Sequence, residues 1–110
     1  MGTTERVESD RIEVTAQGAR TTAALRGEFD MAATFTVEPA LEEAVAANGL
    51  EALTLDLGHV TFIDSTGVGV LLRVHEEAER RGVELAIEPG PPEVQRVFEV
   101  AGLTELLPFR

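Results

Sequence analysis

Cysteine and lysine are both missing from this sequence of 110 residues. Without cysteine the chain has no disulfide, no thiolate nucleophile and no cysteine-ligated zinc. Without lysine it cannot form a Schiff base with a substrate, and it lacks the lysine with which a P-loop holds nucleotide phosphates. These two absences exclude several large classes of enzyme and metalloprotein.

Positive charge is also scarce, with nine basic residues against 20 acidic ones and a formal net charge of −11 at pH 7. Proteins that bind nucleic acid neutralise phosphates with basic patches, so this balance argues against a nucleic-acid partner. An acidic surface favours solubility, which is the simpler interpretation, and it also suits a basic protein partner. Charge alone leaves both interpretations open.

Long hydrophobic runs are missing as well. No run approaches the length of a membrane-spanning helix, and the opening MGTTERVESD has no hydrophobic signal core. Met1-Gly2 resembles the start of a myristoylation motif, but Arg6 stands where that motif requires Ser or Thr. We therefore expect a cytoplasmic protein without a membrane partner.

The first half of the chain predicts a flexible lead over residues 1–9, followed by a single folded domain over 10–110. Apolar and polar residues alternate on both sides of Gln17-Gly18, which predicts a hairpin of two strands, about 11–15 and 20–26.

A helix is predicted after this hairpin, with Asp30 as its N-cap and Asn48-Gly49 at its end. An apolar stripe supports it: Leu41, Ala44, Val45. Proline is unfavourable inside a helix, so we expect Pro39 at or near the first turn, with residues 31–37 irregular or loosely helical.

The second half alternates strands and helices. Strands are predicted at 51–58, 83–89 and, at an edge, 103–109; helices at 66–81, ending at Gly82, and at 92–100. The resulting order is β-β-α-β-α-β-α-β. Strands that alternate with helices predict an α/β domain, here a mixed β-sheet covered by helices.

The stretch FIDSTGVGVLL, from Phe62 to Leu72, contains the most informative residues. Ser65 follows a strand and begins a helix, where unpaired N–H groups favour a hydroxyl, a carboxylate or a phosphate. Gly67 and Gly69 together cost about 2 kcal/mol relative to alanine inside a helix. Ser65 is therefore a candidate nucleophile, phosphate ligand, modification site or plain helix cap, and the cap, at about 1 kcal/mol, is the simplest role.

The helix after Ser65 has two kinds of apolar residue. One set has three- and four-residue spacing and should pack on the sheet: Gly67, Val70, Leu71, Val74, Ala78. Val68 and Leu72 lie outside this stripe. They either pack against a neighbouring helix or form an apolar spot beside Ser65, and periodicity leaves both open.

Enzyme motifs fit this stretch poorly. A nucleophile elbow requires glycine where Ile63 stands, and Gly67-x-Gly69 lacks the third glycine of a dinucleotide-binding loop. His59 is expected in a connecting loop and His75 two turns away from the helix start, so no spacing defines a Ser-His-Asp triad. We expect no enzyme activity, no cofactor and no metal site.

Three segments nevertheless resemble a known family. VTFIDSTGVGVLLRVHEEAERRGVELAI closely resembles the signature of STAS-domain anti-anti-sigma factors, also called anti-sigma factor antagonists. LRGEFD resembles that family's segment at the end of the second strand, and VQRVFEVAGLTELL resembles its last helix and strand. The resemblance begins near Arg11 and implies a single STAS domain. It does not extend through Met31–Pro39, and no role is transferred to residues there.

The resemblance implies a binding protein with a phosphorylation switch. In this family the unphosphorylated form binds an anti-sigma factor, which is a serine kinase, and thereby releases a sigma factor during, for example, a stress response. Phosphorylation of the motif serine, here Ser65, breaks the complex, and a phosphatase restores it. Supporting roles fall on three neighbours: Asp30, Asp64, Thr66. Partner binding falls on four more: Gly67, Val68, Gly69, Leu72. Thr66 is the second choice as phosphate acceptor.

Two other functions remain open for such a fold. One is a scaffold or regulatory module, as in stressosome subunits or transporter tails. The other is a domain that binds a small molecule or nucleotide. Neither would require the partner switching that the motif implies.

Overall fold

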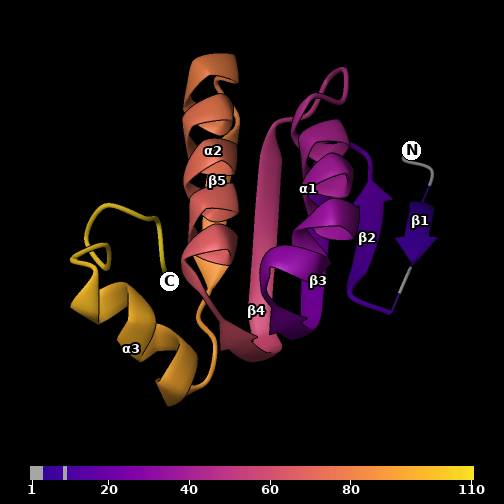
Figure 1. Cartoon of the computed structure of the whole chain (residues 1–110). Helices are drawn as coiled ribbons and strands as arrows, with labels where there is room; N and C mark the ends of the chain where they lie inside the picture. Colours follow the sequence, from indigo (N-terminus) through magenta and orange to yellow (C-terminus); the bar gives the residue numbers. More distant parts are fainter. Residues whose placement is uncertain (1–3, 9) are drawn as a thin grey trace.

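The computed structural model describes the backbone of residues 4–8 and the whole of residues 10–110. Five strands and three helices are present in this part of the chain (Figure 1). They are β1 (Thr4–Glu8), β2 (Ile12–Gln17), β3 (Arg20–Phe29), α1 (Met31–Val45), β4 (Ala52–Ile63), α2 (Ser65–Arg81), β5 (Glu84–Glu88) and α3 (Pro92–Val100).

The strands form one mixed sheet in the order β1-β2-β3-β4-β5. The pairs β1–β2 and β2–β3 are antiparallel, whereas β3–β4 and β4–β5 are parallel. Gly18, at φ 62°, provides the left-handed conformation for the tight β2–β3 turn. The parallel pairs are joined by α1 and α2, as crossover connections require. The prediction of an α/β domain with a mixed sheet is confirmed.

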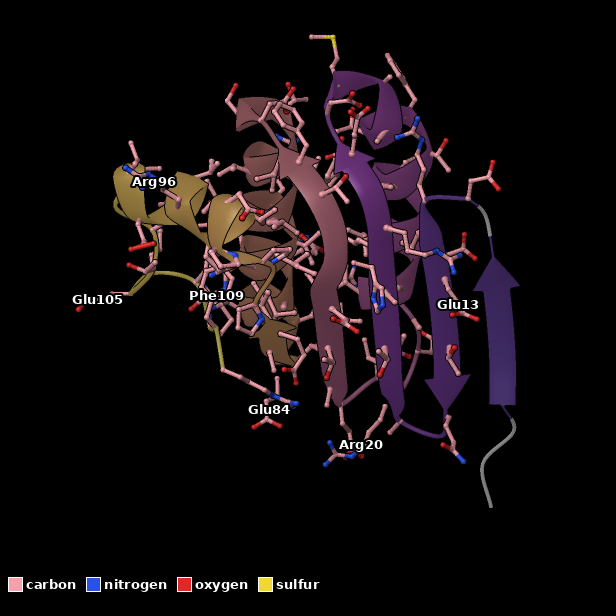
Figure 2. The ribbon with its side chains drawn as sticks, turned by 90° about the horizontal axis from the view of Figure 1, so that it is seen from below. Glu13, Arg20, Glu84, Arg96, Glu105 and Phe109 are labelled. Atoms are coloured by element: carbon pink, nitrogen blue, oxygen red, sulfur yellow. The ribbon has the colours of Figure 1, made fainter. Side chains whose placement is uncertain are left out.

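Helices α1 and α2 lie side by side on one face of the sheet, and α3 lies beside the β5 end (Figure 1). Between sheet and helices, the alternating leucines of β4 are fully buried: Leu53, Leu55, Leu57. The predicted stripe of α2 is buried against them. Figure 2 shows the sheet in front of α1 and α2. In the described part of the chain, no helix combines the length and apolar character that crossing a bilayer requires.

The N-terminal strand was not predicted. Residues 4–8 form β1, which pairs with β2 from Thr4↔Gln17 to Glu8↔Glu13, where a flexible lead over 1–9 was expected. Main-chain hydrogen bonds hold such an edge strand, and they do not depend on an apolar side-chain pattern. The prediction is therefore wrong for residues 4–8, and residues 1–3 and 9 lie outside the described part of the chain.

Helix α1 starts at Met31 and continues through Pro39, whereas an irregular approach over 31–37 was predicted. The expected N-cap is confirmed, because Asp30 Oδ1 accepts a hydrogen bond from the N–H of Ala33 at 3.0 Å. Burial of three apolar turns on the sheet outweighs the backbone hydrogen bond that proline cannot donate. The helix ends at Val45, earlier than the predicted Asn48-Gly49.

Strand β4 extends to Ile63, well beyond the predicted 51–58, and it includes His59, which was expected in a loop. The register of β3 against β4 shifts twice, between Ala24/Arg26 and Gly27/Glu28. These irregularities break the strict alternation that the prediction followed, yet Val60 and Ile63 are again buried.

The predicted edge strand over 103–109 does not form. Turns replace it, followed by a single parallel bridge between Ile87 and Phe109. Pro108 has no N–H for a ladder, and Phe109 instead packs edge-on against Phe98, with ring centroids 5.0 Å apart. Helix α3 has the predicted bounds, with Val94 and Phe98 buried.

Replacing Pro39 by alanine tests whether α1 tolerates this proline at a cost in stability. Pro39 is exposed, so alanine leaves the core intact and restores one helical hydrogen bond. Part of this gain is offset because proline also restricts the unfolded chain. We expect Pro39→Ala to raise the free energy of unfolding by about 1–2 kcal/mol in urea denaturation. A free energy of unfolding below that of the unmodified protein would show that the proline is favourable at this position.

Candidate functional site

The ends of two parallel strands place the motif residues together. Phe29, the last residue of β3, is the register partner of Ile63, the last residue of β4. The N–H of Asp64 also donates to the carbonyl oxygen of Phe29 at 3.4 Å. Asp30 and Asp64 therefore follow neighbouring strands at one end of the sheet, the edge that is formed by the carboxyl ends of β3 and β4. The structure thus brings Asp30 and the Asp64-Ser65 pair to the same edge.

Each aspartate caps the helix that follows it. Asp30 caps α1, and Asp64 Oδ1 accepts hydrogen bonds from the N–H groups of Thr66 at 3.0 Å and Gly67 at 3.1 Å. Such a cap contributes about 1 kcal/mol. The helix cap is therefore Asp64 and not Ser65, which answers one of the roles left open for the serine.

Ser65 is the first residue of α2, and its side chain is exposed at the surface. Its neighbour Thr66 is half-buried. His75 lies ten residues later on α2, about 15 Å along the helix axis. His59 lies six residues earlier, inside β4. The geometry therefore gives Ser65 no neighbouring histidine that could act as a general base.

The described residues at this edge do not form a candidate metal site. Among the residues that the structure describes, no three or more histidine, aspartate and glutamate side chains are grouped so that they could hold a metal ion. Asp30 and Asp64 both use a carboxylate oxygen for capping.

The two glycines of the motif have different surroundings. A Cβ at Gly67 would lie 2.5 Å from the carbonyl oxygen of Phe29 and 3.0 Å from Ile63 Cγ1, so glycine lets α2 approach the end of β3. A Cβ at Gly69 would meet only Arg73 Nη1, at 3.4 Å. Packing within the domain therefore requires glycine at position 67 and not at position 69.

The predicted partner-binding residues divide in the same way. Val68 is buried in the hydrophobic core, and Gly67 is buried beneath the first turn of α2. Gly69 is half-buried in an open position, and Leu72 is half-buried with part of its side chain against the core. Of the two roles left open for Val68 and Leu72, internal packing holds for Val68. Only Gly69 and Leu72 are placed where another protein can contact them.

Two apolar residues beside this edge escaped prediction. Met31 and Phe35 lie on the first two turns of α1, with 62% and 79% of their surface exposed. They fall in the segment that was expected to be irregular. Their four-residue spacing places them on one side of a helix, but this signal becomes readable only when α1 is known to begin at Met31.

An ion pair joins the two helices behind this edge. Arg73 Nε on α2 donates to Glu38 Oε2 on α1 at 2.7 Å. This hydrogen bond raises the pKa of Arg73 above its ordinary value, and the charges of Glu42 and Glu76 add to the effect. The pair lies at the surface, so its stabilising effect is small, but it fixes which sides of α1 and α2 face each other.

Comparison with known proteins places this architecture in a family. The model of the STAS domain matches residues 11–110. An anti-sigma F factor antagonist from Paenibacillus polymyxa is 31% identical over 85 residues, covering 77% of this chain and 73% of the relative. An anti-sigma-B factor antagonist from Listeria monocytogenes is 31% identical over 84 residues, covering 76% and 73%.

A solved structure agrees with this assignment. The crystal structure of an anti-sigma factor antagonist from Mycobacterium paratuberculosis superposes with a TM-score of 0.75 at 24% identity, covering 97% of this chain and 83% of the other. At this identity the likeness concerns the fold. Together with the match over 11–110, it leaves no ambiguity about the family: the chain belongs to the STAS domain family.

The contrast between the two glycines predicts opposite effects of one substitution. Gly67→Ala forces a methyl group against the Phe29 carbonyl and should lower the free energy of unfolding by about 1–3 kcal/mol. Gly69→Ala meets no backbone and gains helix propensity, so it should raise the free energy by about 0.5–1 kcal/mol. Urea denaturation measures both. Equal effects at the two positions would contradict the assigned contacts.

Proposed function

We propose that this protein is a cytoplasmic anti-sigma factor antagonist. In its unphosphorylated form it binds an anti-sigma factor and thereby releases a sigma factor for transcription. Phosphorylation of Ser65 by that anti-sigma factor, a serine kinase, ends the binding, and a phosphatase restores it. The protein itself catalyses no reaction. The observation that carries the proposal is that Ser65, the first residue of α2, is exposed at the edge where β3 and β4 end.

Three further observations support this proposal. Relatives from two genera carry the name of anti-sigma factor antagonist. Ser65 has an accessible side chain, and the cap hydrogen bonds that could have occupied it are made by Asp64. The chain contains one other serine, Ser9, which lies outside the described residues. A kinase that selects serine therefore has few targets.

The surroundings of Ser65 favour a switch that acts on the partner. A phosphoserine carries roughly −1.5 to −2 charges at neutral pH. The N–H groups of Thr66 and Gly67, which would ordinarily attract this charge, already bind Asp64. The phosphate therefore projects from the surface, where a partner carboxylate about 4 Å away is repelled by ~4 kcal/mol at an effective dielectric near 20. This corresponds to about a thousandfold loss of affinity.

The test of the acceptor uses the purified anti-sigma kinases from the genome that encodes this chain, with labelled ATP. Ser65→Ala should abolish labelling while the protein still binds the kinase, and Ser65→Glu should weaken binding because it adds charge at the same place. Ser9→Ala, which removes the other serine of the chain, is the matched control and should be labelled normally. Phosphate incorporation into Ser65→Ala at the unmodified rate would refute Ser65 as the acceptor.

The supporting role proposed for Asp30 can be separated from its role as a helix cap. Asparagine caps helices about as well as aspartate but carries no charge, so Asp30→Asn should leave the unfolding midpoint nearly unchanged. If the carboxylate assists phosphorylation, the variant should be labelled about tenfold more slowly, equivalent to ~1.4 kcal/mol in the barrier. Its affinity for the kinase should change less. An unchanged rate would restrict Asp30 to capping.

A further inference from the structure

The exposed apolar residues of α1 belong to the side of the helix that faces α2. Met31, Phe35, Glu38 and Glu42 follow one another at intervals of four, three and four residues, which places them in one stripe. Glu38 accepts the hydrogen bond from Arg73 of α2, and Glu42 lines the groove between the two helices. Met31 and Phe35 therefore lie on the same side of α1 as this groove, nearer to the start of the helix than the residues that line it.

A matching stripe on α2 begins at Ser65 and reaches this groove at Arg73. Ser65, Gly69 and Arg73 are spaced by four residues, and the Arg73 side chain reaches back toward Gly69. Because α1 and α2 both follow parallel strands, they run in the same direction (Figure 1). Met31 and Ser65 are the first residues of their helices, and Phe35 and Gly69 are the fifth. The ion pair farther along shows that the two stripes are in register.

This register places the large apolar side chain of Phe35 at the level of a glycine, Gly69. Phe35 is 79% exposed, and at the corresponding position of α2 Gly69 has no side chain, although packing within the domain does not require glycine there. Exposed aromatic residues are typical anchors of protein interfaces, and a position without a side chain lets a partner side chain approach the ring closely. The surface is also contiguous with Ser65, one helical turn before Gly69.

Charge decides which kind of partner fits. The groove beyond Gly69 is lined by five glutamates and two arginines: Glu38, Glu42, Glu43, Glu76, Glu77, Arg73, Arg81. Both arginines are already paired, Arg73 with Glu38 and Arg81 with Glu77. A second copy of this chain would oppose glutamates with glutamates, and an anionic bilayer would also be repelled. A protein with an apolar centre and a basic rim fits both the groove and the net charge of −11.

We propose that Met31, Phe35 and Gly69 form the anchoring surface for the anti-sigma factor. An apolar side chain of the partner lies over Gly69 against the Phe35 ring, and basic residues of the partner face Glu38 and Glu42. This inference rests on the proposed function and adds the residues that hold the partner. It makes docking and phosphorylation neighbouring but separable events, because the two anchoring side chains, Met31 and Phe35, lie on α1 and the acceptor lies on α2.

The experiment measures the affinity of this protein for each purified anti-sigma kinase of its own genome by isothermal titration calorimetry. Phe35→Ala should weaken binding at least about thirtyfold, as expected for an interface anchor. Met31→Ala should weaken it less. Gly69→Ala should weaken it severalfold while raising the midpoint of urea unfolding. The matched control is Val100→Ala on α3, an apolar residue that is 81% exposed and should leave the affinity unchanged.

The outcomes distinguish this surface from the phosphorylation switch. Unchanged affinity of Phe35→Ala overturns the anchoring surface, even if Ser65→Glu abolishes binding and the proposed function stands. Weak binding by Phe35→Ala, with Ser65→Glu binding normally, supports the surface and refutes the switch. A dimer in sedimentation velocity that Phe35→Ala dissociates would make a second copy the occupant and overturn the proposal. If no kinase binds the unmodified protein, the proposed function and the surface fail together.

Discussion

The approach of α2 to the end of β3 is the contact on which the site depends. It is possible because Gly67 lies directly against the carbonyl group of Phe29, where a single methyl group would collide. The same carbonyl accepts the N–H of Asp64, so strand end, cap and helix start are fixed in one small region. Ser65 takes its position from this arrangement. A serine on a less constrained loop would sample many positions, whereas Ser65 is held in one.

Helix capping and the proposed acceptance of a phosphate fall on different residues of the site. Asp64 holds the first turn of α2 together through the N–H groups of Thr66 and Gly67, so Ser65 is not needed for folding. The serine hydroxyl is thereby free to change its chemistry without removing a structural hydrogen bond. A modification placed on the capping residue itself would instead change helix stability and signalling together.

Local rules predicted much of this arrangement. The cap Asp30, the helix end at Gly82 and the buried stripe of α2 depend on neighbouring residues, and each could be predicted from the sequence. Helix α1 could not, because Pro39 opposes a helix locally and burial against the sheet overrides it. The exposed Phe35 was missed for the same reason. The different roles of Gly67 and Gly69 were also beyond the sequence, since only the contact with Phe29, remote in sequence, distinguishes two glycines of one motif.

The last residues of the chain have a consequence for how this sheet meets other molecules. Ile87 of β5 donates its N–H to the carbonyl of Pro108 and accepts from the N–H of Arg110. The chain end thus occupies hydrogen-bonding groups that an edge strand would otherwise offer to a strand of another protein. At Ile87 these residues therefore stand in the way of β-augmentation, a main-chain pairing that accepts almost any sequence, whereas the side chains of a helix can discriminate between partners.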